Sequence, residues 1–154
     1  MNNIPLWGIQ LIERVRRLER QYRHLQREND TLRAEMWNLS MARMNLLCMS
    51  NSRLRVVDFA IFVKTVAGKG QALPGSNPTE QEEEELEQLQ DLPIGAPVPA
   101  EYFPRTLLEL VDWSHHQINT LSVLLNHTFE INPGDSIAVR SYRVLERITQ
   151  PLYY

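Results

Sequence analysis

Arginine is the residue type in this sequence whose number and spacing could form a binding site for anionic groups. One group lies in the N-terminal part of the chain and consists of Arg16, Arg17, Arg20, Arg23 and Arg27. A second group, Arg140, Arg143 and Arg147, has the spacing of a single helical face. Stripes of guanidinium groups can neutralise nucleic-acid phosphates, which gives salt-dependent binding that ignores base sequence. Both groups are therefore candidate nucleic-acid contacts.

Each arginine group also has a simpler interpretation. The first group can simply form the charged surface that a long helix presents to solvent or to another protein. The acidic run at 80–87 is a possible partner for these arginines. The second follows a helix and a turn, as in a helix-turn-helix reader, but the turn at 127–135 is long for that motif. An ordinary helical hairpin explains the second group as well.

Metal binding and catalysis have weaker support in the sequence. Glu109, Asp112 and His116 share one face of a predicted helix, yet no second ligand cluster accompanies them. Cys48 is the only cysteine, so CxxC metal patterns are absent, and no catalytic triad or glycine-rich phosphate loop is found. We therefore predict a protein that is not an enzyme, with no metal, no cofactor and no small-molecule substrate.

The element that must position most of these residues is a long N-terminal helix with a heptad repeat. Leucine occupies one position every seven residues: Leu11, Leu18, Leu25, Leu32, Leu39 and Leu46. The alternating positions hold Val15, Tyr22, Asn29, Met36 and Arg43. Leucine at d and a mixed set at a is the pattern of a two-stranded coiled coil. We predict that this stretch, apart from Arg43, forms a dimerisation surface.

Polar residues in the repeat indicate a parallel, in-register homodimer. Asn29 at an a position can pair with its copy across the axis, which disfavours other registers and larger oligomers. The flanking positions place Arg14 opposite Glu19 of a partner, and Glu28 opposite Arg33. A heterodimer with a similar zipper and a trimer are the alternatives.

The stretch 14–36, RVRRLERQYRHLQRENDTLRAEM, resembles the zipper of basic leucine-zipper transcription factors. The resemblance covers the heptads alone. That family's DNA-contacting helix would lie before the first leucine, where ten residues precede Leu11 and none of them is basic. We therefore expect a dimerising helix that does not insert into a DNA groove in that family's manner.

The positions of helix-breaking residues and the distribution of charge divide the sequence into four regions. Residues 1–49 are the predicted zipper, and 50–67 are an apolar segment for which we favour a helix over a strand. Residues 68–104 read as an acidic, proline-rich linker with one short helix opened by the capping box of Thr79 and Glu82. Residues 105–154 read as a helical hairpin, with one helix from about Pro104 to Leu125 and another over 137–149.

The predicted fold is therefore all-α: an elongated N-terminal parallel coiled coil with a small C-terminal helical region. Residues 1–67 hold eleven Lys/Arg and six Asp/Glu, whereas 68–104 hold one and eight, so the two blocks differ sharply in charge. No apolar run is long enough for a membrane span, and no signal peptide is seen, so we expect an intracellular protein without membrane contact. The predicted function is that of a scaffold or adaptor that dimerises and binds a protein partner through its C-terminal region. A dimeric nucleic-acid-binding regulator is the alternative.

Overall fold

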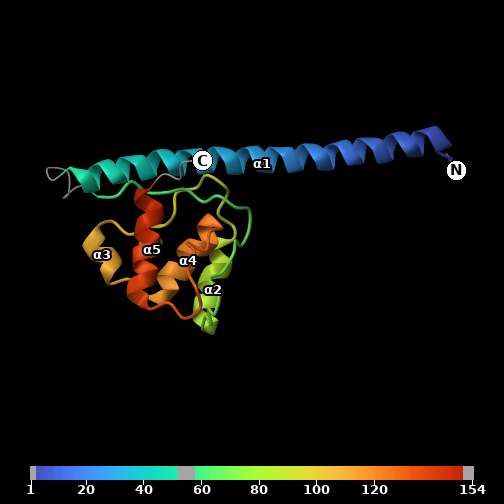
Figure 1. The fold of residues 1–154 in the computed structure, drawn as a ribbon. Helices are drawn as coiled ribbons and strands as arrows, with labels where there is room; N and C mark the ends of the chain where they lie inside the picture. The colour runs from blue at the N-terminus through green and yellow to red at the C-terminus, as the bar shows by residue number, and fades with distance from the viewer. Residues whose placement is uncertain (1–2, 52–57, 151–154) are drawn as a thin grey trace.

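A computed structural model describes residues 3–51 and 58–150, and it shows a long helix with a compact helical unit packed below one end (Figure 1). The described elements are α1 (Leu6–Ser50), α2 (Glu80–Leu89), η1 (Ala100–Tyr102), α3 (Leu107–Val111), α4 (His115–Leu125) and α5 (Ile137–Thr149). Over these residues the only β pairing is one antiparallel bridge, between Val63 and Pro97. The all-α prediction is confirmed. We call residues 58–150 the head.

Helix α1 is continuous over 45 residues, which corresponds to about 67 Å at ~1.5 Å per residue. It begins directly after Pro5, whose fixed backbone angle suits a helix start. Its first half projects beyond the head, and its second half carries the head (Figure 1). The helix therefore supplies both a free rod and one wall of the folded unit.

The head packs on a stripe of small and amide side chains in the second half of α1. We call this the docking stripe: Ala34, Asn38, Ala42 and Asn45, all of them buried. Alanine lets the head approach closely, and each asparagine binds extended backbone in the segment that begins the head. Asn38 Nδ2 donates to Val63 O at 2.9 Å, and Asn38 Oδ1 accepts from Val63 N at 2.7 Å.

Asn45 binds two separate parts of the head. Its Oδ1 accepts from Ala60 N at 2.6 Å, and its Nδ2 donates to Ala60 O at 3.2 Å and to Ile148 O at 3.0 Å. The last of these bonds reaches the end of α5. Asn45 thus ties the first and last segments of the head to α1.

The core of the head is centred on α4. Every residue of α4 from Ile118 to Leu125 is buried, and α5 contributes Val144 and Ile148 to the same cluster. Phe62 and Phe103, from two extended segments, pack with ring centroids 5.3 Å apart. Residues 58–104 therefore contribute to the core through Phe59, Phe62, Leu73, Val98, Tyr102 and Phe103.

The helix that we favoured for the apolar segment is wrong where the structure describes it. Residues 58–67 are extended apart from bends near 66–67, while 52–57 lie outside the described residues. The segment lies between α1 and the rest of the head, and asparagine side chains and the Val63–Pro97 bridge satisfy its backbone. Its apolar character arises because it is covered on two sides.

The predicted linker at 68–104 folds as part of the head. Leu73, Leu86, Val98 and Phe103 are buried, and the predicted capping box of Thr79 and Glu82 is present at the start of α2. The other end of α2 is closed by a lysine. Lys64 is fully buried, and its Nζ donates to Leu89 O, Gln90 O and Leu92 O at 3.3, 3.1 and 2.7 Å.

The predicted single helix from Pro104 to Leu125 is two helices. Helix α3 ends at Val111, and Ser114 begins α4 with a capping box that it shares with Gln117. Helix α4 ends at Asn126, which adopts the left-handed conformation at φ 49°. Helices α4 and α5 then pack together as the expected helical pair, joined by residues 126–136.

Candidate interaction site

The apolar residues of the heptad repeat remain on the surface of the chain. We call Leu11, Val15, Leu18, Tyr22, Leu25, Asn29, Leu32, Met36, Leu39 and Leu46 the heptad seam. Leu18, Tyr22 and Leu25 are 55%, 68% and 62% exposed. Towards the head the exposure falls, since Leu39 is half-buried and Leu46 is 37% exposed. A contiguous apolar stripe of this length is a candidate surface for another chain.

The head and the heptad seam use different sides of α1. With leucine at d, Ala34 is at f, Asn38 and Asn45 are at c, and Ala42 is at g. Positions c and f lie opposite the a and d positions on a helix of 3.5 residues per turn. The head therefore packs without covering most of the seam.

The polar residues predicted to set register also lie on the surface. Asn29, Arg14, Glu19 and Arg33 are exposed, as is Glu28, whose carboxylate lies 3.3 Å from His24 within the same helix. Arg43, the last a residue, is exposed too. Their placement is compatible with contacts to another helix along the seam.

The five N-terminal arginines all project from the free rod. Arg16, Arg17, Arg20, Arg23 and Arg27 are exposed. The acidic residues of α2 that form ion pairs in the described chain, Glu82 and Glu85, do so with His116. With leucine at d, these arginines are at positions b, c and f, so they form a basic surface on the side of the rod that faces away from the apolar seam.

The three C-terminal arginines do not form one exposed stripe. Arg140 is 7% exposed and donates to the carbonyl oxygens of Asp135, Pro133 and Asn132 at 3.1, 3.2 and 3.5 Å. Arg143 lies 3.2 Å from Glu146 and 3.9 Å from Glu130, and Arg147 is half-buried. Arg140 therefore holds the loop before α5.

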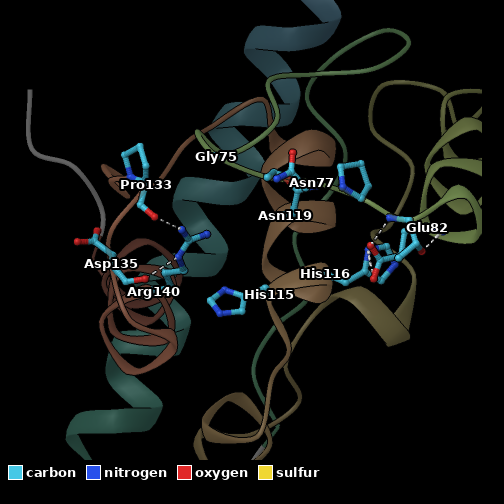
Figure 2. Close-up of a pocket in the computed structure, with 12 residues that line it drawn as sticks. Gly75, Asn77, Glu82, His115, His116, Asn119, Pro133, Asp135 and Arg140 are labelled. Atoms are coloured by element: carbon cyan, nitrogen blue, oxygen red, sulfur yellow. Dashed lines mark hydrogen bonds and ion pairs between the residues drawn. The ribbon is translucent and has the colours of Figure 1, made fainter.

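A polar pocket of about 460 Å³ lies where the first turns of α2, α4 and α5 meet (Figure 2). Thr79, His115 and Asp135 come from these three helix starts, and the loop 75–78 closes one side. The buried side chains of Asn119 and Arg140 form its inner wall. Figure 2 shows Arg140 extending from α5 towards α4, with His115 nearby.

Beside this pocket, one carboxylate joins α2, η1 and α4. Glu85 Oε2 accepts from Tyr102 Oη at 2.9 Å and lies 2.9 Å from His116 Nε2. The contact with His116 lowers the pKa of Glu85 most, and the hydrogen bond from Tyr102 lowers it further. Burial and the neighbouring Glu85 raise the pKa of Tyr102 to about 12. The cluster holds α2 against α4.

The residues considered for a metal are separated by the break between α3 and α4. Glu109 accepts from Arg105 N at 3.2 Å and Asp112 ends α3, whereas His116 faces Glu85. Across residues 3–51 and 58–150, no three His, Cys, Asp or Glu side chains are grouped so as to hold a metal ion.

The docking stripe is the site that the sequence analysis missed. Ala34, Asn38, Ala42 and Asn45 recur at intervals of four, four and three residues, which is the spacing of one helical face. Such a stripe on the side opposite a heptad seam indicates a second contact surface on the same helix. That signal was present in the sequence.

Comparisons with protein-family models, with curated protein sequences and with solved structures found no match to this chain. Among the described helices, none combines the length and the apolar character needed to cross a membrane.

Proposed function

We propose that this protein is a non-enzymatic scaffold that pairs two copies of itself through the heptad seam. The two rods would lie parallel and in register, and each would carry a head at the same end. The observation that supports this proposal is the separation of the two stripes on α1. The head is packed against alanine and asparagine, while the leucine-rich side of the same helix is exposed.

The physical cost of an unpartnered seam supports pairing. Burying a leucine side chain stabilises by about 1.5–3 kcal/mol, and the seam repeats leucine over five heptads. Asn29 favours two strands in register, because two amides can then hydrogen-bond across the axis. The head is the part that would bind a protein partner, and its presentation as a pair would raise avidity.

Sedimentation of the full chain tests the pairing. We expect a dimer at micromolar concentration, and a monomer once Leu18→Glu and Leu25→Glu are combined, since both changes place charge in the seam. The matched control combines Ile9→Glu and Met44→Glu, two exposed apolar residues outside the a and d positions. A wild-type monomer, or equal loss in the control, would contradict the proposal.

A single introduced cysteine tests the orientation. Cys48 is the only cysteine, so Val15→Cys in a Cys48→Ser background provides one thiol at an a position. In a parallel, in-register pair the two copies of this thiol face each other within disulfide range. We expect rapid interchain oxidation. An antiparallel pair would leave the thiols far apart and unoxidised.

A dimeric nucleic-acid-binding regulator is a second candidate, favoured by the exposed rod arginines. Binding by these residues would fall steeply with salt and would show no preference for base sequence. Titration of the full chain with arbitrary duplex and single strands at low salt tests it. The variant Arg16→Gln, Arg20→Gln, Arg23→Gln should bind more weakly, and absence of binding to either strand type would exclude this candidate.

A further inference from the structure

The polar pocket between α2, α4 and α5 contains hydrogen-bond donors without acceptors. Asn119 is 4% exposed, and its Oδ1 accepts from Leu73 N at 2.9 Å. Among the described residues, no group accepts a hydrogen bond from its Nδ2. An amide nitrogen carries two donors, so Asn119, which lines this pocket, has both of them available to a ligand.

Arg140 lines the same pocket and also has a side-chain donor without an acceptor. It is 7% exposed, and its Nε and Nη2 donate to the loop carbonyls of residues 132–135. Within the described chain its Nη1 has no acceptor. The three carbonyls fix the guanidinium plane and hold its remaining donors in place. Binding of a ligand to these donors would therefore cost little side-chain entropy.

Three capped helices begin near the pocket, and the start of one of them, α4, adds to this excess of donors. Thr79, Ser114 and Ser136 each accept from the third backbone N–H of their helix, at Glu82, Gln117 and Val139. These caps leave the first two N–H groups of each helix without an intrahelical acceptor. Of these residues, His115 and His116 at the start of α4 line the pocket, so the positive end of this 11-residue helix lies at it.

The acidic groups of the pocket are already engaged with backbone donors. Glu82 Oε2 accepts from Thr79 N at 2.9 Å, and its Oε1 lies 4.0 Å from His116 Nδ1. Asp135 Oδ2 accepts from Asn132 N at 2.8 Å. Each carboxylate thus uses one oxygen on a backbone N–H, and in the described chain Glu82 Oε1 and Asp135 Oδ1 accept no hydrogen bond.

We propose that this pocket binds an oxyanion, with inorganic phosphate or the phosphate group of a small molecule as the ligand. Arg140 Nη1 and Asn119 Nδ2 would bind its oxygens from the inner wall. His115, exposed in the first turn of α4, would complete the site from its open side. Buried arginine and helix starts are the usual means of holding phosphate. This site is independent of the heptad seam.

Calorimetry of the full chain with inorganic phosphate, at constant ionic strength, tests the proposal. We expect saturable binding with one site per chain. Asn119→Asp keeps the oxygen that accepts from Leu73 N and replaces the free donor with a negatively charged acceptor. We expect at least tenfold weaker binding for this variant.

A matched control and a second variant separate loss of the binding site from loss of folding. Gln88→Glu makes the same amide-to-acid change on an exposed residue of α2 outside the pocket, and it should bind as wild type. His115→Glu changes only an exposed residue, so it tests the site if Asn119→Asp fails to fold. No saturable binding by the wild type, or equal affinity for wild type and both pocket variants, would overturn the proposal.

The same titration distinguishes free phosphate from a phosphate group on a larger molecule. A phosphate monoester such as glycerol phosphate should bind more tightly than inorganic phosphate if the pocket also holds the attached group. Equal affinities identify the anion alone as the ligand. Tighter binding of the monoester that Asn119→Asp removes identifies a phosphorylated small molecule.

Discussion

Two stripes run along α1 with opposite composition and opposite exposure. The docking stripe is alanine and asparagine and is buried, whereas the heptad seam is mostly leucine and is exposed. In a chain that functions alone, the leucines would be the residues expected inside. The difference shows that α1 joins its own head through close approach and hydrogen bonds. It leaves the larger apolar surface free for a proposed second chain.

The two stripes also give asparagine two different tasks. Asn45 binds three backbone groups of the head at distances of 2.6–3.2 Å, while Asn29 lies exposed on the seam. The first asparagine contributes to folding of the chain. The second is proposed to set the register of a pair, at a cost in stability. Changes at the two positions should therefore act on different equilibria and in opposite directions.

The largest expected effect is that of Asn45→Ala. It leaves Ala60 N–H and Ile148 C=O without their partner in a buried junction, and each unsatisfied group costs about 1–3 kcal/mol. We expect the free energy of unfolding of the head to fall by roughly 3 kcal/mol, measured by urea denaturation of the full chain. Asn29→Ala is the control and should leave the unfolding of the head unchanged.

Ala42→Leu tests whether the docking stripe requires small residues. Ala42 is 2% exposed, so a larger side chain must push the head away from α1, at about 1–3 kcal/mol. The melting temperature of the head should drop accordingly. Met44→Leu, at a position that is 52% exposed, should shift it little. Equal shifts would mean that the head does not depend on this close approach.

Asn29→Val should be stabilising, because it should strengthen the association of the two chains. An apolar side chain at this position removes the cost of an amide in the seam, on the order of 1 kcal/mol. We expect tighter association in sedimentation equilibrium, together with species larger than the dimer. Weaker association would show that Asn29 contributes net stability and would contradict the register role.

The flanking charges should give a smaller change. Arg14→Glu places like charges at the predicted Arg14–Glu19 contact and should weaken association by about 0.5 kcal/mol. Combining it with Glu19→Arg should restore the wild-type affinity. The effect should disappear at 1 M salt, because screening shortens the range of such pairs to ~3 Å. If the double variant stays weak, the two residues are not paired across the seam.

The smallest expected effect is a change in how the stability of the head depends on pH in the acidic range. The pKa of Glu85 is lowered from its usual 4.5 by its hydrogen bonds to His116 and Tyr102. A lowered carboxyl pKa stabilises the fold above the unfolded value and loses that contribution as pH falls through the folded value. Glu85→Gln should therefore be less stable than wild type at neutral pH, and the difference should begin to shrink as pH falls below about 4.5. A gap that stays constant with pH would contradict this assignment.

The sequence predicted the parts of the fold that depend on local pattern. The capping box at Thr79, the turn before α5 and the helical state of the heptad stretch all follow from residues within a few positions of one another. The break between α3 and α4 was missed, although Ser114 and Gln117 have the spacing of a capping box.

The rest depends on contacts between distant parts of the chain. The extended state of 58–67 relies on Asn38 and Asn45, which lie 25 and 15 residues from the backbone groups that they bind. Asn45 and Ile148 are 103 residues apart. Arg140 was predicted to share one helical face with Arg143 and Arg147 as a candidate nucleic-acid contact, yet its guanidinium is buried and donates to carbonyls of the preceding loop. The pocket arises from the same nonlocal packing.

The placement of Lys64 has a consequence for labelling the protein. The chain has two lysines, Lys64 and Lys69, and the first is enclosed at the end of α2 with all of its donors engaged. Burial also lowers its pKa. Lys69 is exposed. An amine-reactive dye or cross-linker should therefore modify one side chain per native molecule, and reaction at Lys64 would serve as a direct reporter of unfolding.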